Sequence, residues 1–109
     1  MRKRATKTPA LLTRVRKSIA VGDFLDTTHA LARRSERFIS RPEILQVLRS
    51  GWHEKNKDQY REEYQSWNYA IRGVTVDGRE LRIVVSFEED RLLIVTAIDL
   101  EKSNEEKES

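Results

Sequence analysis

The spacing of apolar residues changes part-way along the chain, and that change limits the folds open to it. Up to about residue 51, apolar side chains recur three and four positions apart, which is typical of helices with one buried face. From Trp67 they alternate with polar side chains, and Asp77-Gly78 between two alternating stretches predicts a β-hairpin. Residues 92–100 are nearly all apolar, which indicates a strand covered on both faces. We expect an α+β fold, with N-terminal helices packed on one face of an antiparallel meander of three or four strands.

Three helices are expected before the strands, over residues 9–21, 29–38 and 40–51. Thr8 is a suitable N-cap for the first helix, and Gly22 is a suitable residue for its end. A short extended stretch at residues 24–28 leads into the second helix.

The third helix carries the clearest local signal. Ser40, Pro42 and Glu43 form a capping-box pattern, in which the Glu43 carboxylate reaches back to the residue that caps the helix. Gly51 is expected to end this helix. The polar residues 52–64 that follow predict a loop or a poorly covered strand.

The chain has 109 residues, which is the length of a single domain. We expect a flexible basic head at residues 1–8, one domain at residues 9–100 and a disordered acidic tail at residues 101–109. Because the chain has no cysteine and only two histidines, neither a metal nor another cofactor is expected. No apolar run is long enough to cross a membrane, and the lack of cysteine favours a cytoplasmic location.

Positive charge is concentrated at the start of the chain, where residues 1–17 hold lysines and arginines and no acidic residue. Arg14, Arg16 and Lys17 lie on the face of the first helix opposite its apolar residues. This segment either faces a polyanion or is an ordinary solvated terminus and helix face. Both interpretations remain open at the level of the sequence.

The second predicted helix carries the main candidate site. His29, Arg33 and Arg37 follow one another at intervals of four and therefore share one face of a helix, with Arg34 beside them. A histidine at a helix start is favoured in its neutral form, which is the form that a general base requires. Two guanidinium forks next to it can hold a phosphate. The alternatives are a histidine that only packs or caps, and arginines paired with acidic residues.

A second candidate surface lies on the strands. Arg72 and Arg82 alternate with the apolar residues, so they are expected to meet on the less apolar sheet face, with Ser86 and Thr96 beside them. Such a face can hold a nucleic-acid backbone, although isolated arginines on a solvated face are common. His53 is interpreted as a solvent-facing residue of a polar loop. Several aromatic side chains could stack on bases, namely Trp52, Tyr60, Tyr64, Trp67 and Tyr69. Because Trp67 and Tyr69 alternate with polar neighbours, a place in the core is favoured for these two.

The residues from Thr28 to Gly51 resemble an uncharacterised bacterial domain family, whose motif reads His-Ala-x-x-Arg-x-x-Glu-Arg-Gly-Ile-Ser. The histidine and the two arginines of this motif correspond here to His29, Arg33 and Arg37. The resemblance extends over about residues 24–100, through features such as Gly73, Asp77-Gly78 and Val95-Thr96-Ala97. Phe38 departs from the motif, which has a glycine at this position.

That family is itself similar to the RelE-like and BrnT-like toxins, which are small metal-independent ribonucleases of toxin–antitoxin systems. The resemblance therefore implies a RelE/barnase-like arrangement, with helices before a curved antiparallel sheet. It also implies catalytic roles for His29, Arg33, Arg37 and Thr96, the last near the end of the final strand.

The leading hypothesis is a metal-independent, toxin-like ribonuclease or RNA-binding module of a toxin–antitoxin type system. His29 would act as general base or acid, Arg33 and Arg37 would hold the scissile phosphate, and Arg34, Arg72 and Arg82 would help to bind the substrate. The alternative is a non-enzymatic module that binds nucleic acid or protein, including a degenerate toxin fold. Expected partners are RNA or another polyanion and an antitoxin-like protein. The sequence leaves open whether the protein is catalytic and in which oligomeric state it exists.

Overall fold

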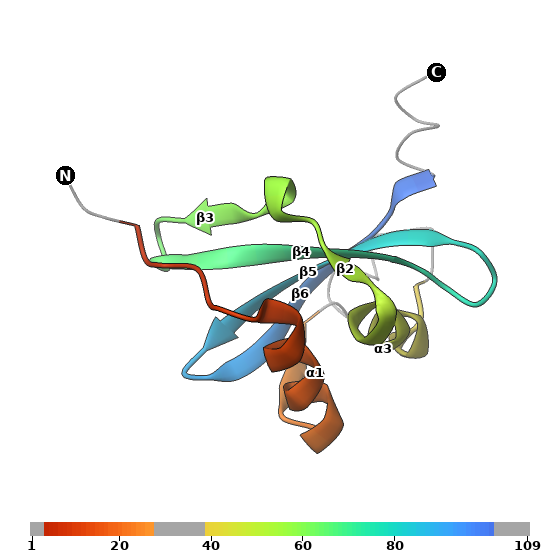
Figure 1. Cartoon of the computed structure of the whole chain (residues 1–109), viewed down its shortest axis with the longest axis horizontal. Helices are drawn as coiled ribbons and strands as arrows, with labels where there is room; N and C mark the ends of the chain where they lie inside the picture. The colour runs from red at the N-terminus through yellow and green to blue at the C-terminus, as the bar shows by residue number, and fades with distance from the viewer. Residues whose placement is uncertain (1–3, 28–38, 102–109) are drawn as a thin grey trace.

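A computed structural model describes residues 4–27 and 39–101 of the chain (Figure 1). These residues form an α+β structure of two α-helices, one short 3-10 helix and six strands. In chain order the elements are α1 (Leu11–Val21), β1 (Phe24–Asp26), α3 (Arg41–Ser50), β2 (Trp52–His53), η1 (Lys55–Lys57), β3 (Gln59–Arg61), β4 (Ser66–Val74), β5 (Glu80–Glu88) and β6 (Arg91–Asp99). The helix expected over residues 29–38 lies outside the described residues.

The strands form one mixed sheet in the order β1-β6-β5-β4-β2, with β3 also paired to β4. The antiparallel meander β4-β5-β6 confirms the hairpins expected from the alternating pattern. The expectation of a purely antiparallel sheet of three or four strands is wrong, because β1 runs parallel to β6, with Phe24 beside Leu92. Parallel neighbours need a long connection, and here the whole stretch from α3 to β5 separates the two strands in sequence.

α1 begins two residues later than predicted and without a side-chain cap, since Ala10 occupies the N-cap position. Thr8 is engaged elsewhere: its N–H donates to the Tyr69 hydroxyl at 2.8 Å, and its own hydroxyl accepts from Arg14 at 2.9 Å. Gly22 ends the helix as predicted, with a φ of 76° that favours glycine.

α3 confirms the predicted capping box. The Ser40 hydroxyl accepts the Glu43 N–H at 3.3 Å, and the Glu43 carboxylate accepts the Ser40 N–H at 3.0 Å. Gly51 ends the helix with an ordinary φ of −79°. Glycine is needed there for space, because a Cβ would lie 2.6 Å from the Val47 carbonyl oxygen and closer still to that of Arg72.

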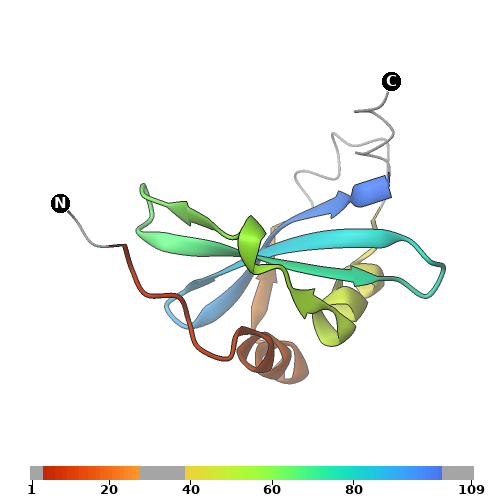
Figure 2. The ribbon, with the colours of Figure 1, turned by 45° about the horizontal axis from the view of Figure 1, so that its top comes forward.

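The core lies between the two helices and one face of the sheet (Figure 2). On β6, Leu92 and Ile94 face this core and are fully buried, whereas Leu93 and Val95 are only partly buried. The expected covering of β6 on both faces is therefore incomplete. The buried apolar residues of the core are Leu11, Val15, Ile19, Ile44, Val47, Leu48, Tyr69, Ile71, Leu81, Ile83, Val85, Leu92 and Ile94.

Residues 52–64, predicted as a loop or a poorly covered strand, contain β2, η1 and β3. β2 pairs with β4 through His53 and Ile71, and β3 pairs with β4 through Tyr60 and Trp67. η1 turns the chain between these two short strands. Within the described residues, no helix is long and apolar enough to cross a membrane.

Candidate functional site

The main predicted site cannot be placed in the described part of the chain, because residues 28–38 lie outside it. The convergence of an imidazole and two guanidinium groups on a phosphate therefore stays a prediction. The residues concerned are His29, Arg33, Arg34 and Arg37, together with Phe38, which departs from the family motif.

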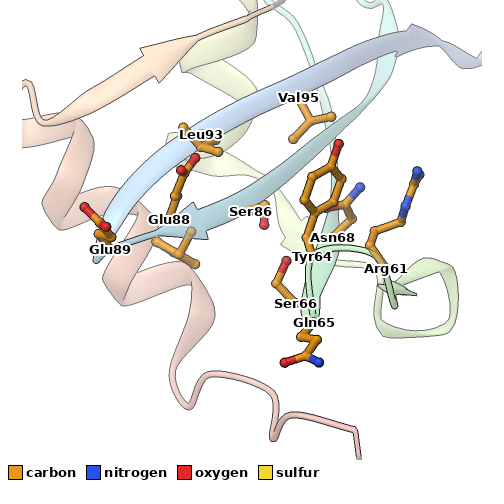
Figure 3. A pocket seen from close by; sticks show the side chains of 11 residues that line it. Arg61, Tyr64, Gln65, Ser66, Asn68, Ser86, Glu88, Glu89, Leu93 and Val95 are labelled. Carbon is orange, nitrogen blue, oxygen red and sulfur yellow. The ribbon is translucent and has the colours of Figure 1, made fainter.

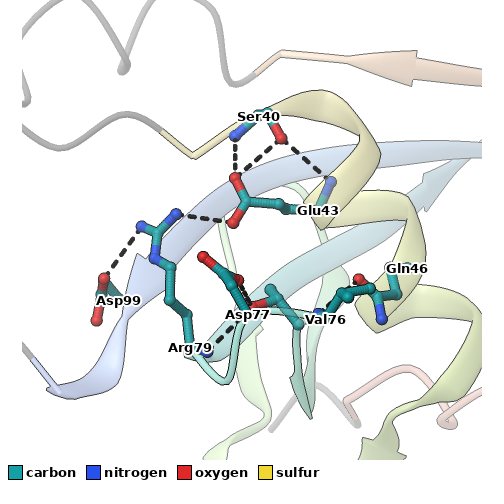
Figure 4. A network of polar contacts seen from close by, with 8 residues as sticks. Ser40, Glu43, Gln46, Val76, Asp77, Arg79 and Asp99 are labelled. Carbon is teal, nitrogen blue, oxygen red and sulfur yellow. Dashed lines mark hydrogen bonds and ion pairs between the residues drawn. The ribbon is translucent and has the colours of Figure 1, made fainter.

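The described residues on either side of this segment are firmly attached. Before it, Thr27 donates its N–H at 3.0 Å and its hydroxyl at 2.6 Å to the carbonyl oxygen of Ile94 on β6. After it, the Ser40–Glu43 capping box joins a network around Arg79 (Figure 4). Arg79 donates to Glu43 at 2.8 Å and to Asp99, at the end of β6, at 3.1 Å.

This network also stabilises the charged form of Glu43. The hydrogen bond from the Ser40 N–H is the main cause that lowers the pKa of Glu43, with burial acting in the opposite direction and Arg79 adding to the lowering. The network thus ties the start of α3 to the β4–β5 hairpin and to the end of β6.

Arg72 and Arg82 lie side by side as predicted, in register across β4 and β5. Both reach Glu54, which lies between β2 and η1: Arg82 Nε and Arg72 Nη1 are 2.7 and 3.2 Å from its carboxylate oxygens. Arg72 Nε also donates to Glu80 at 2.6 Å. Each of the two guanidinium groups therefore faces a carboxylate.

The ion pairs around Glu54 are partly buried, and they shift the pKa values of their members. The hydrogen bond from Arg82 is the main cause that lowers the pKa of Glu54, against the effect of burial. The hydrogen bond to Glu80 is the main cause that raises the pKa of Arg72. A phosphate would have to displace these carboxylates in order to bind Arg72 or Arg82. The substrate-binding role of the two arginines stays a prediction.

Thr96 pairs with Val84, which is two residues after Arg82 on β5 and therefore points to the same face of the sheet. A bulge follows this pair. Thr96 is partly buried. Ser86 also points to this face, but it is buried, and its hydroxyl donates to the Trp67 carbonyl oxygen at 3.0 Å. The strand register therefore places Arg72, Arg82, Ser86 and Thr96 on one face of the sheet, as predicted. The Ser86 hydroxyl is already used in a hydrogen bond to β4.

A groove of about 760 Å³ opens on the sheet face opposite the helices (Figure 3). Tyr64, with 75% of its surface exposed, and Arg61 stand on one side of it, and Glu88 and Glu89 line its other side. The acidic pair repels phosphate, whereas an aromatic ring beside an apolar and amide-bearing floor suits a flat ring such as a base. The floor is made by Asn68, Ser86, Leu93 and Val95.

The interpretation of His53 as a solvent-facing loop residue is wrong. His53 belongs to β2, its side chain is 15% exposed, and its Nε2 lies 2.8 Å from Oδ2 of Asp58, whose side chain is fully buried. Asp58 also pairs with Lys7 Nζ at 2.9 Å and accepts the Ala70 N–H at 2.9 Å. The sequence gives no signal for this contact, because the short turn η1 that brings Asp58 back to β2 has no distinctive pattern.

Comparison of the sequence with models of protein families identifies one family. Residues 27–99, well over half of the chain, match the family described as a domain of unknown function, DUF4258. The protein belongs to the DUF4258 family. No curated protein and no solved structure matches the chain significantly.

The DUF4258 span runs from the end of β1 to the end of β6, which is close to the extent of about residues 24–100 expected for an uncharacterised family. α1 lies before this span, yet Leu11, Val15 and Ile19 are buried in the core. In this chain α1 therefore completes the core of the DUF4258 domain. The kinship with RelE-like and BrnT-like toxins stays a prediction.

Proposed function

We propose that this DUF4258 protein is a toxin-like module that binds RNA and cleaves it without a metal ion. His29 is assigned as general base or acid, and Arg33 and Arg37 are assigned to the scissile phosphate. The support is the resemblance of residues 28–51 to a motif that combines a histidine with two arginines at helical spacing.

The structural observation that supports the proposal is the attachment of the described residues on either side of residues 28–38. The neighbour before this segment, Thr27, is bonded to Ile94, and the network after it ends on Asp99. Both contacts lie on β6, on either side of Thr96 and about 17 Å apart along an extended strand. The residues that flank residues 28–38 are thus tied to the strand that carries the fourth predicted catalytic residue.

The reaction we propose follows from these residue types. His29 takes the proton of the RNA 2′-hydroxyl, the 2′-oxygen attacks phosphorus, and the bond from phosphorus to the 5′-oxygen breaks. The departing 5′-oxygen takes a proton from water, and His29 later returns its proton to the hydroxide that forms. The products are a 2′,3′-cyclic phosphate and a 5′-hydroxyl end. Arg33 and Arg37 stabilise the charge that develops on the phosphate oxygens, and the Thr96 hydroxyl orients a reacting group. None of these steps requires a metal.

Cleavage of a short labelled RNA by the full chain tests the proposal. The wild-type protein should produce cyclic phosphate ends, and His29→Ala should slow cleavage by about 10²–10⁴-fold. Arg49→Ala, which removes an exposed arginine at the end of α3, is the matched control and should leave the rate unchanged. Equal rates for wild type and His29→Ala, or no cleavage by either, would remove the catalytic claim.

A non-enzymatic binding function is the second candidate, and the N-terminal segment favours it. Arg4 stacks over Tyr60 at 5.4 Å, and Lys7 lies 4.6 Å from the Trp67 ring centre. The Trp67 indole N–H donates to the Ala5 carbonyl oxygen at 2.7 Å. These contacts hold basic side chains against the domain, next to aromatic rings that nucleic acid can also use.

The basic residues of α1 contribute less to such a surface. Arg14 pairs with Asp90 at 3.0 Å and stacks on Phe87, and Arg16 donates to the Gly51 carbonyl oxygen at 3.0 Å. Under the binding hypothesis, Arg4→Ala should weaken RNA binding and flatten its salt dependence, while any cleavage rate stays the same. Point substitutions are needed here, because removing residues 1–17 would also remove part of the core.

A further inference from the structure

His53 and Asp58 form a pair in which the carboxylate is buried, the imidazole is partly exposed, and one ring nitrogen has no described partner. Nε2 donates to Asp58 Oδ2 at 2.8 Å, and the same carboxylate is completed by Lys7 and by the Ala70 N–H. Nδ1 makes no hydrogen bond within the described structure, and no buried polar side-chain atom there lacks a partner. Nδ1 is therefore open to solvent or to a ligand.

The space in front of this ring is a cavity of about 500 Å³. It lies between residues 7–13, which lead into and begin α1, and the β2–η1 segment, and both His53 and Lys55 line it. Lys55 is exposed and forms no ion pair with a described residue. Lys7 neutralises Asp58, so Lys55 leaves a net positive charge at the cavity, which protonation of His53 increases.

We propose that this cavity binds a phosphate group, with Lys55 and His53 as its binding residues. The ammonium group of Lys55 donates hydrogen bonds to phosphate oxygens, and His53 Nδ1 does so when both ring nitrogens carry a proton, with Nε2 held by Asp58. The Thr8 and Thr13 side chains at the lining are compatible with the same ligand. The phosphate can be free or part of an RNA chain, and only the RNA source rests on the function proposed above.

Asp58 acts through His53 and is a positioning residue. It fixes the Nε2 proton, and it also ties η1 to β4 through the Ala70 N–H. Replacing Asp58 would disturb the fold as well as the site. The test therefore uses η1, where Lys55 lines the cavity and Lys57 does not, although both lysines are exposed.

Binding of inorganic phosphate and of a four-nucleotide RNA is measured by NMR on the folded full chain. The wild-type protein should bind phosphate, and Lys55→Ala should weaken binding by about tenfold, the loss of one charge-assisted contact. Lys57→Ala should bind as the wild type does. Phosphate should also change the NMR signals of the His53 ring, because the anion contacts Nδ1. A purely structural histidine would not respond in this way.

Equal effects of the two lysine substitutions, or His53 ring signals that do not change when phosphate is added, would overturn the proposal. Binding of phosphate but not of RNA would support the cavity and assign it to a small anion. The cleavage assay with His29→Ala tests the catalytic role of His29, which is not part of this cavity. Failure of the ribonuclease proposal and failure of this site are therefore distinguishable.

Discussion

Gly73 lies against Gly51 where the end of α3 meets β4, and a methyl group on Gly73 would come within 3.2 Å of the Gly51 Cα. The same group would be 3.1 Å from a methyl carbon of Val47, which is fully buried. The two glycines thus set the spacing between α3 and the sheet. They also explain why the helix ends at a residue whose backbone conformation does not require glycine.

Gly51→Ala should destabilise the protein by about 1–3 kcal/mol, because the new Cβ overlaps two carbonyl oxygens that cannot both move away. Urea unfolding measures this free energy. Lys17→Ala, at an exposed position of α1, should change it by less than about 0.5 kcal/mol. If the two variants unfold at the same urea concentration, the close approach of α3 to β4 is not as described.

Ser40→Ala should destabilise the protein by about 1 kcal/mol, since it removes the side-chain cap of α3 and one partner of Glu43. Ser50→Ala is the control on the same helix, because Ser50 is exposed at the last turn and only bonds back to the Gln46 carbonyl oxygen. Thermal unfolding of both variants compares the two positions. A smaller effect at Ser40 than at Ser50 would contradict the role of the capping box.

Stability should decrease in acid through Glu43 and Glu54. The Ser40 N–H lowers the pKa of Glu43, and the hydrogen bond from Arg82 lowers the pKa of Glu54, both from an ordinary value of 4.5. The unfolded chain therefore binds protons more readily, so the stabilisation is complete above that value and is lost as the pH falls through the lower folded-state values. The urea midpoint should fall between about pH 5 and pH 3. Glu54→Gln should show a smaller fall than the wild type over the same range.

Arg82→Gln should destabilise the protein by about 1–3 kcal/mol, because it leaves Glu54, only 12% exposed, with Arg72 as its remaining partner. Adding Glu54→Gln should recover part of this loss. The free energies of the two single variants and the double variant form a cycle that isolates the pair. Additive effects would mean that Arg82 is not held by Glu54 and is free for another ligand.

Local chemistry explains which elements could be predicted from the sequence. The capping box at Ser40 and Glu43 and the Asp77-Gly78 turn depend on residues within a few positions of each other, and both are confirmed. Gly78 adopts a φ of 85°, the conformation for which glycine is suited. The alternating apolar pattern likewise places Ile83 and Val85 in the core.

The features that could not be predicted from the sequence depend on contacts between distant segments. The parallel pairing of β1 with β6 joins residues that the whole sheet separates in sequence, and Thr8 leaves its expected capping position for the Tyr69 hydroxyl. Arg72 and Arg82 were predictable as neighbours from strand phase, but their shared partner Glu54 lies in a turn that carries no clear pattern. The partnership of His53 and Asp58 was hidden for the same reason.

The outermost strands of the described sheet are short: β1 and β3 have three residues each, and β2 has two. A long edge strand has many unpaired backbone groups that can hydrogen-bond to a strand of another molecule, whereas a short edge strand has few. β2 and β3 together pair with much of the outer edge of β4, whereas β1 pairs with β6 only at Leu92–Ile94. We infer that high concentration should not drive this protein into fibrils through the outer edge of β4.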